Sequence, residues 1–379
     1  MHLRGTHPFL DLTRACGMNQ SGEEKLHPCF EPKQLAEKGG TVKKVIGLYL
    51  CVVMVTALAV PAVWAESGEV TIGYQLIFNP WKVAIAGGDF EKATGHKINW
   101  RKFDSPGKLL PAIASGDVQI GLLGSTGVTT AMSNGLNVEL FWIAEGIAAA
   151  EALVVRDGSG IVAPQDLIGK KLATPFVSTT HFHILFALEQ FGIDPKKVTL
   201  LNLPPNAIAA AWQRGDIDAA FVWDPALSTI KKTGKVLITS GELGRWGKPT
   251  FDGLVVEREF ARSHPEFMLQ FVQVLAQTDA AYRDNPDAWT PDSPQVQAIV
   301  SLVGGEPKDV PAVLASYIFP TPEQQVSCGW LGCGKDGGAA RALKATAEFL
   351  KTEKKIPAVL PDYSLYVNPG WVQSALKNR

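Results

Sequence analysis

The sequence predicts an α/β protein with two doubly wound lobes around a hinged ligand cleft. Short apolar or alternating runs recur along the chain with helical segments between them, which is typical of parallel sheets covered by helices on both faces. The second observation is a repeat, because GDVQIGLLGST at 116–126 returns as GDIDAAFVWDP at 215–225, each copy after a short helical run. Two such units predict two lobes, and sheets of this kind bind ligands beyond the carboxyl ends of their strands.

The expected strands are runs of β-branched, aromatic and other apolar residues. They occupy 70–75, 97–103, 120–125, 138–144, 151–156, 171–176, 198–203, 219–223, 235–240 and 252–257. Two of these runs, EALVVR at 151–156 and DGLVVE at 252–257, resemble each other and are expected to be the crossing strands that join the lobes.

The expected helices begin near Ser, Thr or Asn and end near Gly, and those between the strands occupy 105–116, 178–194 and 204–216. After residue 260 strand patterns fade, and helical periodicity covers 265–286, 293–304 and 338–353. The expected divisions are an extension with a signal peptide at 1–65, the first part of lobe 1 at 66–154, lobe 2 at 155–248, and the rest of lobe 1 with a helical cap at 249–379.

Residues 43–65 have the layout of a secretory signal. Two lysines precede an apolar run that ends in V-x-A, so we expect cleavage after Ala65 and export to the periplasm. An uncleaved membrane anchor is the alternative, because the apolar run can span a bilayer at roughly 20 residues. Pro61 and the V-x-A ending favour cleavage.

Two further interpretations concern the same end of the chain. A lipoprotein anchored at Cys51 is disfavoured, because Leu50 before it is bulky and the cysteine lies at the start of the apolar run. Residues 1–41 show no apolar periodicity, and we hypothesise that translation starts at Val42.

The charge and cysteine content narrow the function. The formal net charge is -1 and no block of Lys or Arg exceeds a pair, so a nucleic-acid-binding protein is excluded. The exported chain keeps only Cys328 and Cys333, which form a small disulfide or remain two free thiols. A zinc site needs four ligands and finds no partner pair, and no cofactor is expected.

Hydroxyl groups at two expected helix starts suggest an anion site. Ser178, Thr179 and Thr180 follow a strand and begin a helix, where free backbone N–H groups attract negative charge. Helix capping alone is the alternative. Ser125 and Thr126 begin a helix in the other lobe, and two such sites suit a sulfonate or a carboxylate.

Aromatic and acidic residues complete the expected site. Trp223, Trp246 and Phe78 lie near the strand ends, where a ring can close over the methylene groups of a ligand. Asp252 and Glu151 begin the two crossing strands and could pair with an ammonium group.

An enzyme is the rival class of protein. His181 and His183 lie near Ser178, but STTHFH lacks the G-x-S-x-G elbow, and residues two apart point to different helix faces. The sequence contains no H-E-x-x-H, P-loop or G-x-G-x-x-G motif, so we expect no catalytic residues.

A family resemblance rests on WRKFDS, ASGDVQIG, EALVV, DLIGKK, PFVSTTHF, AAWQRGDIDAAFVW, WGKPTFD, NPDAW and KIPAVLPDYSLYV. Together these motifs resemble the periplasmic taurine-binding proteins of taurine ABC importers, from about Glu69 to near the C-terminus. The resemblance implies a type II periplasmic-binding-protein fold. It also implies a monomer that delivers its ligand to a membrane permease and its ATPase.

The resemblance also implies roles for single residues. Ser125, Ser178, Thr179 and Thr180 are then sulfonate contacts, Asp252 reads the ammonium group, and Gln75 belongs to the first ligand loop.

The sequence departs from the family directly after that loop, because LIFNPWK at 76–82 is less polar than expected, through Leu76, Phe78 and Trp81. Hypotaurine, another aminosulfonate or an alkanesulfonate therefore remains an alternative ligand. The thiamin-pyrimidine synthases share the superfamily, but they are cytosolic and carry a Cys-rich motif that this chain lacks.

Overall fold

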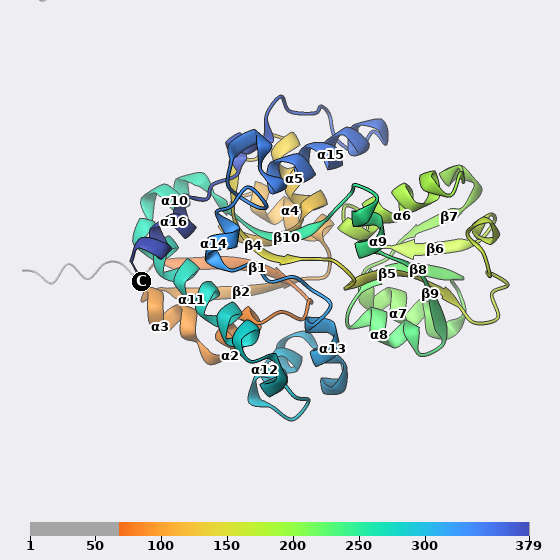
Figure 1. Ribbon diagram of the computed structural model, residues 1–379, viewed down its shortest axis with the longest axis horizontal. Coiled ribbons are helices and arrows are strands. Elements are labelled where there is room, and N and C mark those ends of the chain that lie inside the picture. Colours follow the sequence, from red (N-terminus) through yellow and green to blue (C-terminus); the bar gives the residue numbers. More distant parts are fainter. Residues whose placement is uncertain (1–67, 379) are drawn as a thin grey trace, which may run out of the picture. The chain divides into compact units, whose positions relative to one another are not determined.

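The computed structural model describes residues 68–378, which form two five-stranded sheets with helices on both faces of each (Figure 1). The predicted signal peptide, its cleavage after Ala65 and the alternative start at Val42 lie outside the described residues. No helix between residues 68 and 378 combines the length and the apolar character needed to cross a membrane.

The first sheet combines strands from both ends of the described chain, in the order β2-β1-β3-β10-β4. Its strands are β1 (Glu69–Gln75), β2 (Lys97–Phe103), β3 (Ile120–Gly124), β4 (Val138–Gly146) and β10 (Phe251–Glu257). β1 runs parallel to β2 and β3, whereas β10 runs antiparallel to both of its neighbours.

The second sheet repeats this arrangement, in the order β7-β6-β8-β5-β9. Its strands are β5 (Glu151–Arg156), β6 (Lys171–Thr174), β7 (Thr199–Asn202), β8 (Ala219–Trp223) and β9 (Gly234–Thr239). β6 runs parallel to β7 and β8, whereas β5 runs antiparallel to β8 and β9.

The prediction of parallel sheets was therefore wrong for one strand in each sheet. A parallel neighbour needs a crossover of a dozen or more residues to return the chain to the starting edge. Only residues 147–150 separate β4 from β5, and only residues 246–250 separate α9 (Ser240–Arg245) from β10. Each crossing strand therefore enters its new sheet at the edge where the parallel strands end, and it runs in the opposite direction.

The predicted repeat and the crossing strands are confirmed. β3 and β8, which end the two copies of the repeated motif, occupy the same central place in their sheets, each beside the antiparallel strand. The expected boundary after residue 154 falls inside β5, which pairs with the second sheet along its whole length. The first crossing therefore precedes Glu151.

The predicted helices of the two lobes are present as α4 (Pro106–Ala114), α5 (Ser125–Ser133), α6 (Thr179–Gln190) and α7 (Pro205–Arg214). Four helices between the strands escaped the periodicity analysis, namely α2 (Trp81–Gly87), α3 (Asp89–Thr94), α8 (Ala226–Lys231) and α9. Each has six or seven residues, and two turns are too few for an apolar stripe to repeat.

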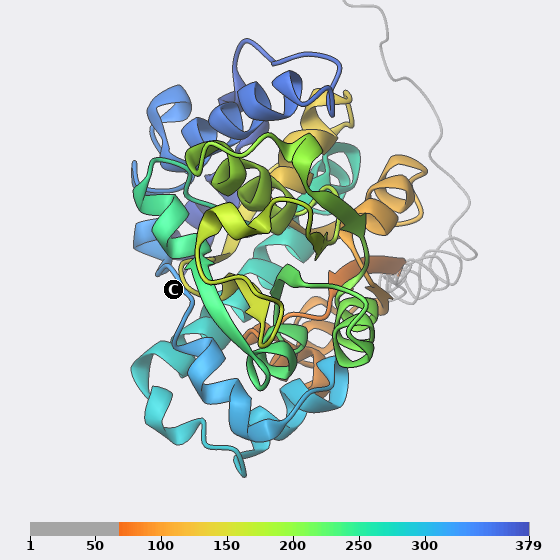
Figure 2. The same cartoon turned by 90° about the vertical axis from the view of Figure 1, so that its right-hand side faces the viewer.

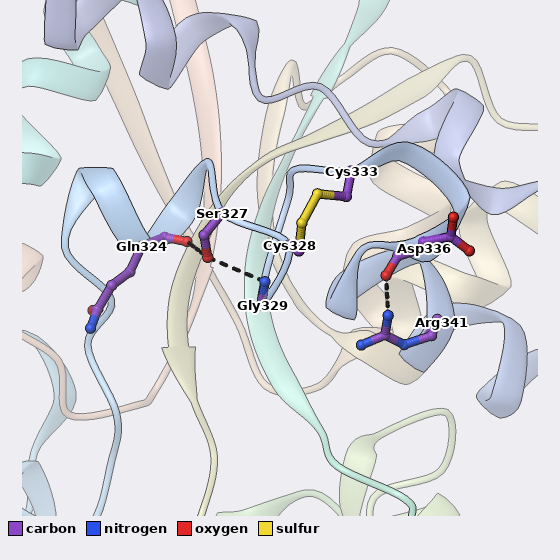
Figure 3. The surroundings of a disulfide bond; sticks show 7 residues. All are labelled: Gln324, Ser327, Cys328, Gly329, Cys333, Asp336 and Arg341. Atoms are coloured by element: carbon purple, nitrogen blue, oxygen red, sulfur yellow. Dashed lines mark hydrogen bonds between the residues drawn. A yellow bond between two sulfur atoms is a disulfide. The ribbon is translucent and has the colours of Figure 1, made fainter.

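The helical cap after residue 260 is confirmed. It contains α10 (Arg258–Ser263), α11 (Pro265–Asp284), α12 (Pro294–Val303), α13 (Val310–Leu314), α14 (Pro322–Gln325), α15 (Gly338–Thr352) and α16 (Gly370–Lys377). α11 packs on α2 and α3, and α15 packs on α5, so the cap covers both faces of the first sheet (Figures 1 and 2). Cys328 and Cys333 form a disulfide in the loop before α15, which decides between the two interpretations of these cysteines (Figure 3).

Candidate functional site

A small polar cavity lies where the strand ends of the two sheets meet. It is lined by Gln75, Ile77, Pro106, Gly124, Glu151, Ser178, Thr179, Trp223 and Asp252. Six of the ten predicted site residues are among them, namely Gln75, Glu151, Ser178, Thr179, Trp223 and Asp252. The centre of a water molecule can occupy only about 10 Å³ of the cavity, so side chains from both sheets close tightly around it. We identify the site by these converging polar groups, because the larger cavities contain none of the ten residues.

The hydroxyl groups at the start of α6 divide into two roles. Ser178 caps the helix by accepting from the His181 N–H at 3.1 Å, so the capping interpretation holds for this residue. Thr180 lies behind it, 2.7 Å from the Ser178 hydroxyl and 2.8 Å from that of Thr174. Ser178 and Thr179 line the cavity, whereas Thr180 supports Ser178 from behind.

Thr179 connects the hydroxyl groups to a carboxyl group. Its Oγ1 donates to Glu151 Oε1 at 2.5 Å, and Ser240 Oγ lies 3.0 Å from Glu151 Oε2. The sequence analysis missed Ser240, the first residue of α9, because nothing in the sequence brings a helix start of the second lobe to the first residue of β5.

Ser240 joins Glu151 to a buried histidine. His183 Nδ1 lies 2.7 Å from Ser240 Oγ, and Nε2 lies 2.8 Å from the Lys248 carbonyl oxygen. Burial lowers the pKa of His183 to about 4, so the ring is neutral and donates through Nε2. Nδ1 must then accept the single Ser240 proton, and the proton between Ser240 and Glu151 belongs to Glu151. Burial, followed by the negative charge of Asp252, raises the pKa of Glu151 to about 8, which agrees with a protonated carboxyl at neutral pH.

Asp252 belongs to a second buried group of charges. It lies directly opposite Glu145 in the antiparallel pair of β10 and β4. Asn79 donates to Glu145 Oε1 at 3.3 Å, and Lys82 donates to Asn79 Oδ1 at 3.2 Å. Burial raises the pKa of Asp252 to about 7, and it also lowers the pKa of Lys82 to about 7, against the attraction of Glu145 and Asp252.

The sequence analysis also missed Lys82 and Glu145. Two signals could have revealed them, a lysine in the otherwise apolar run WKVAIAG and a glutamate at the end of the apolar strand VELFWIAEG. Around the cavity, the carboxyl groups of Glu145, Glu151 and Asp252 face one amine, that of Lys82. Burial raises the pKa of all three carboxyl groups, and a cationic group that entered the cavity would favour their charged forms.

The start of α5 supplies unpaired hydroxyl groups. Ser125 Oγ and Thr126 Oγ1 are buried and have no hydrogen-bond partner among residues 68–378. They follow Gly124, where a methyl group would lie 2.8 Å from Thr179 Cγ2 and 3.2 Å from Asp252 Oδ1. The glycine therefore allows Thr179 and Asp252 to approach each other beside the N-terminus of α5.

The aromatic residues are corrected by the structure. Trp223 is buried in the cavity wall, and its Nε1 donates to the Leu76 carbonyl at 3.2 Å, which joins β8 to the loop after β1. Trp246 ends α9 with 49% of its surface exposed and packs edge-on against Phe191, away from the cavity. Phe78 is fully buried in the apolar core. Of the three predicted rings, only Trp223 lines the cavity.

The arrangement combines two kinds of polar group, which lie close together around Thr179. Buried carboxyl groups on the crossing strands can pair with an ammonium group. The hydroxyl and backbone N–H groups at the starts of α5 and α6 can bind an anion. No group of three or more His, Cys, Asp or Glu residues within 68–378 could hold a metal ion.

Comparisons with known proteins agree with this geometry. A family model described as NMT1/THI5 like matches residues 81–289. The taurine-binding periplasmic protein of Escherichia coli is 43% identical over 320 residues, which cover 84% of this chain and 98% of the relative.

Two solved structures share the fold. The alkanesulfonate-binding protein SsuA from Xanthomonas axonopodis pv. citri, bound to MOPS, has a TM-score of 0.64 at 22% identity, over 79% of this chain and 96% of its own. The periplasmic aliphatic sulphonate binding protein SsuA from Escherichia coli has a TM-score of 0.64 at 20% identity, over 80% of this chain and 99% of its own. These matches confirm the predicted two-lobed α/β architecture.

Proposed function

The chain belongs to the NMT1/THI5-like family, and from that premise we propose that it is a periplasmic substrate-binding protein that captures taurine for an ABC importer. Like its relative from Escherichia coli, it is a binding protein and not an enzyme. Its partners are the ligand, a membrane permease and the ATPase of that permease. The exported form begins at Glu66, after cleavage behind Ala65, and acts as a monomer.

The observation that carries the proposal is the cavity that combines buried carboxyl groups with residues at the start of a helix. Taurine has an ammonium group at one end and a sulfonate at the other, joined by two methylene groups. Asp252 and Glu151 offer carboxyl groups to the ammonium. The donors proposed for the sulfonate are the backbone N–H groups at the start of α6, where Ser178 and Thr179 line the cavity, and the unpaired hydroxyl groups of Ser125 and Thr126 at the start of α5. Trp223 also lines the cavity.

The unusual loop after Gln75 does not argue against taurine. The rings of Phe78 and Trp81 are buried in the apolar core, and Ile77 is the residue of this loop that lines the cavity. Hypotaurine, which carries a sulfinate, and the alkanesulfonates compete for the same anion-binding groups. The buried carboxyl groups favour ligands that also carry an ammonium group.

A thermal-shift screen tests the proposal. Taurine binds the folded state alone and is expected to raise the melting temperature of the protein. The other compounds are hypotaurine, ethanesulfonate, sulfate, glycine betaine and nitrate. Taurine and hypotaurine are expected to stabilise more than ethanesulfonate, which lacks the ammonium group. A shift with glycine betaine or nitrate and none with any sulfonate would contradict the assignment.

A further inference from the structure

A second cavity, much larger than the first, lies beside the segment that connects α9 to β10. Its volume is about 430 Å³, within the range of small-molecule sites. Its walls come from Phe182 of α6, from residues 247–251, from Gly329 and Trp330 of the disulfide loop, and from one face of α15. α6 belongs to the second lobe and α15 to the cap of the first, so both lobes contribute to this cavity.

The walls are largely aromatic and apolar. Phe182 and Phe251 are buried, and both line the cavity together with Trp330. The Trp330 ring is held against β4, because a methyl group on Gly146 would lie 2.9 Å from it. Ala342 complements the rings from α15. These walls suit a ligand with a flat apolar body.

Arg341 gives the cavity a positive charge, and Thr250 adds a hydroxyl group. Thr250 is 7% exposed, and its buried hydroxyl has no hydrogen-bond partner within the described chain. Arg341 lines the cavity from α15 and donates one N–H to the Asp336 carbonyl, which leaves other guanidinium donors for a ligand (Figure 3). Lys248 also borders the cavity, but its ammonium lies over Phe186, 5.9 Å from the ring centroid, and Phe186 lines a different cavity.

The wall opposite α6 is held together covalently. The disulfide between Cys328 and Cys333 closes the loop that carries Trp330. The first N–H groups of α15 bind this loop, because Gly338 donates to the Cys328 carbonyl at 2.9 Å and Ala339 donates to the Trp330 carbonyl at 3.0 Å. Trp330 and Arg341 therefore belong to one rigid unit.

We propose that this cavity is a second ligand site, which binds a small organic anion with an aromatic body. The carboxylate or sulfonate pairs with Arg341, the Thr250 hydroxyl donates to it, and the ring packs among Phe182, Phe251 and Trp330. The two sites lie on opposite faces of β10, since successive strand residues alternate and Phe251 lines this cavity while Asp252 lines the first. Both sites can therefore be filled at once.

Calorimetric titration with 2-naphthoate tests the second site, because this probe has a flat body and lacks the ammonium group that suits the first cavity. We expect saturable binding of one naphthoate per chain, which persists in saturating taurine. Arg341→Gln is expected to weaken binding by about tenfold through the loss of a charge-assisted pair, and Thr250→Val by a few fold. Lys344→Gln is the matched control, because Lys344 is an exposed lysine of the same helix that does not line the cavity.

Three results would overturn the proposal. Absence of saturable binding would show that the cavity takes no such ligand. Equal effects of Arg341→Gln and Lys344→Gln would reduce the binding to surface charge. Competition by taurine, or loss of naphthoate binding in Asp252→Asn, would place the probe in the first cavity. Taurine binding is measured separately in the same samples. A protein that binds naphthoate but does not bind taurine would refute only the proposed function.

Discussion

Asp252 shows how one buried carboxyl group can discriminate between two sulfonates. Its side chain is 5% exposed and faces Glu145 across the strand pair, so its negative charge has little water to stabilise it. An ammonium group in the cavity adds a second positive charge to that of Lys82. A ligand without an ammonium group gives this carboxyl group no additional positive charge.

Asp252→Asn is therefore expected to weaken taurine binding by roughly 2–4 kcal/mol, as a desolvated charge pair is lost. The affinity for ethanesulfonate is expected to fall far less, or to rise. Calorimetry with both ligands measures the difference. Equal losses would mean that Asp252 supports the fold instead, and Glu151→Gln would then be the next variant.

Ser125 offers a cleaner test of the anion end, because its buried hydroxyl makes no hydrogen bond within residues 68–378. Ser125→Ala is expected to leave the free energy of unfolding nearly unchanged and to weaken taurine binding by roughly 1–3 kcal/mol. Ser133→Ala is the matched control at the other end of α5, where Ser133 Oγ lies 2.7 Å from the Tyr363 hydroxyl. That variant is expected to lose stability and to keep its affinity, and the reverse pattern would move the anion away from Ser125.

At the scale of elements, the two antiparallel strands β5 and β10 determine how the site responds to pH. Each brings a carboxyl group from the edge of its sheet into the cavity, and burial raises the pKa of Glu151 to about 8 and that of Asp252 to about 7. Around the site, β4 contributes Glu145, α2 contributes Lys82, and α6 contributes the neutral His183. Binding of an ammonium group favours the charged carboxylates, so taurine binding releases protons.

The affinity for taurine is accordingly expected to rise from pH 6 to pH 8. Calorimetry in two buffers of different ionisation enthalpy measures the released protons directly. The stability of the ligand-free protein has the opposite trend, because each of the two carboxyl groups has a higher pKa in the folded state than in the unfolded state. The stability that this difference contributes is fully present below the pKa of the unfolded state and is lost as the pH rises through the pKa of the folded state. Its melting temperature should fall from pH 5 to pH 7. An affinity that stays constant from pH 6 to pH 8 would contradict the assigned pKa shifts.

The sequence predicts the elements far better than their directions. Every strand appears where an apolar run ends in a turn, because burial of a pleated surface needs that pattern. The reversed direction of β5 and β10 leaves no local trace, since it depends on short segments between sheets. The same limit explains why Ser240 was missed, because tertiary pairing alone brings it to Glu151. Ser178 follows a visible strand end, and Asp252 begins a visible strand. Trp246 also follows a visible strand, but this exposed ring packs on Phe191 and does not line the cavity.

At the scale of the whole molecule, Trp223 reports on contact between the two lobes. Its Nε1 reaches from β8 of the second sheet to the Leu76 carbonyl of the first, at 3.2 Å. Trp223→Phe keeps the wall apolar but removes this bond, so affinity is expected to fall by roughly 0.5–1.5 kcal/mol. Stopped-flow measurements should show the effect mainly as faster release of taurine.

Trp246→Phe is the matched control, because this exposed ring does not line the cavity. It is expected to leave both rates unchanged. A larger effect for Trp246 than for Trp223 would restore the original assignment of this ring to the ligand.

The position of the two carboxyl groups along the crossing strands sets an order of events. Glu151 is the first residue of β5 and Asp252 the second of β10, each next to a segment about which the lobes would rotate. Residues near the axis of a domain rotation move less than residues far from it. Glu151 and Asp252 would therefore stay close together when the lobes open, whereas the hydroxyl groups on α5 and α6 would separate. Taurine would then bind through its ammonium group first. The later contacts of its sulfonate would stabilise the closed arrangement of the two lobes.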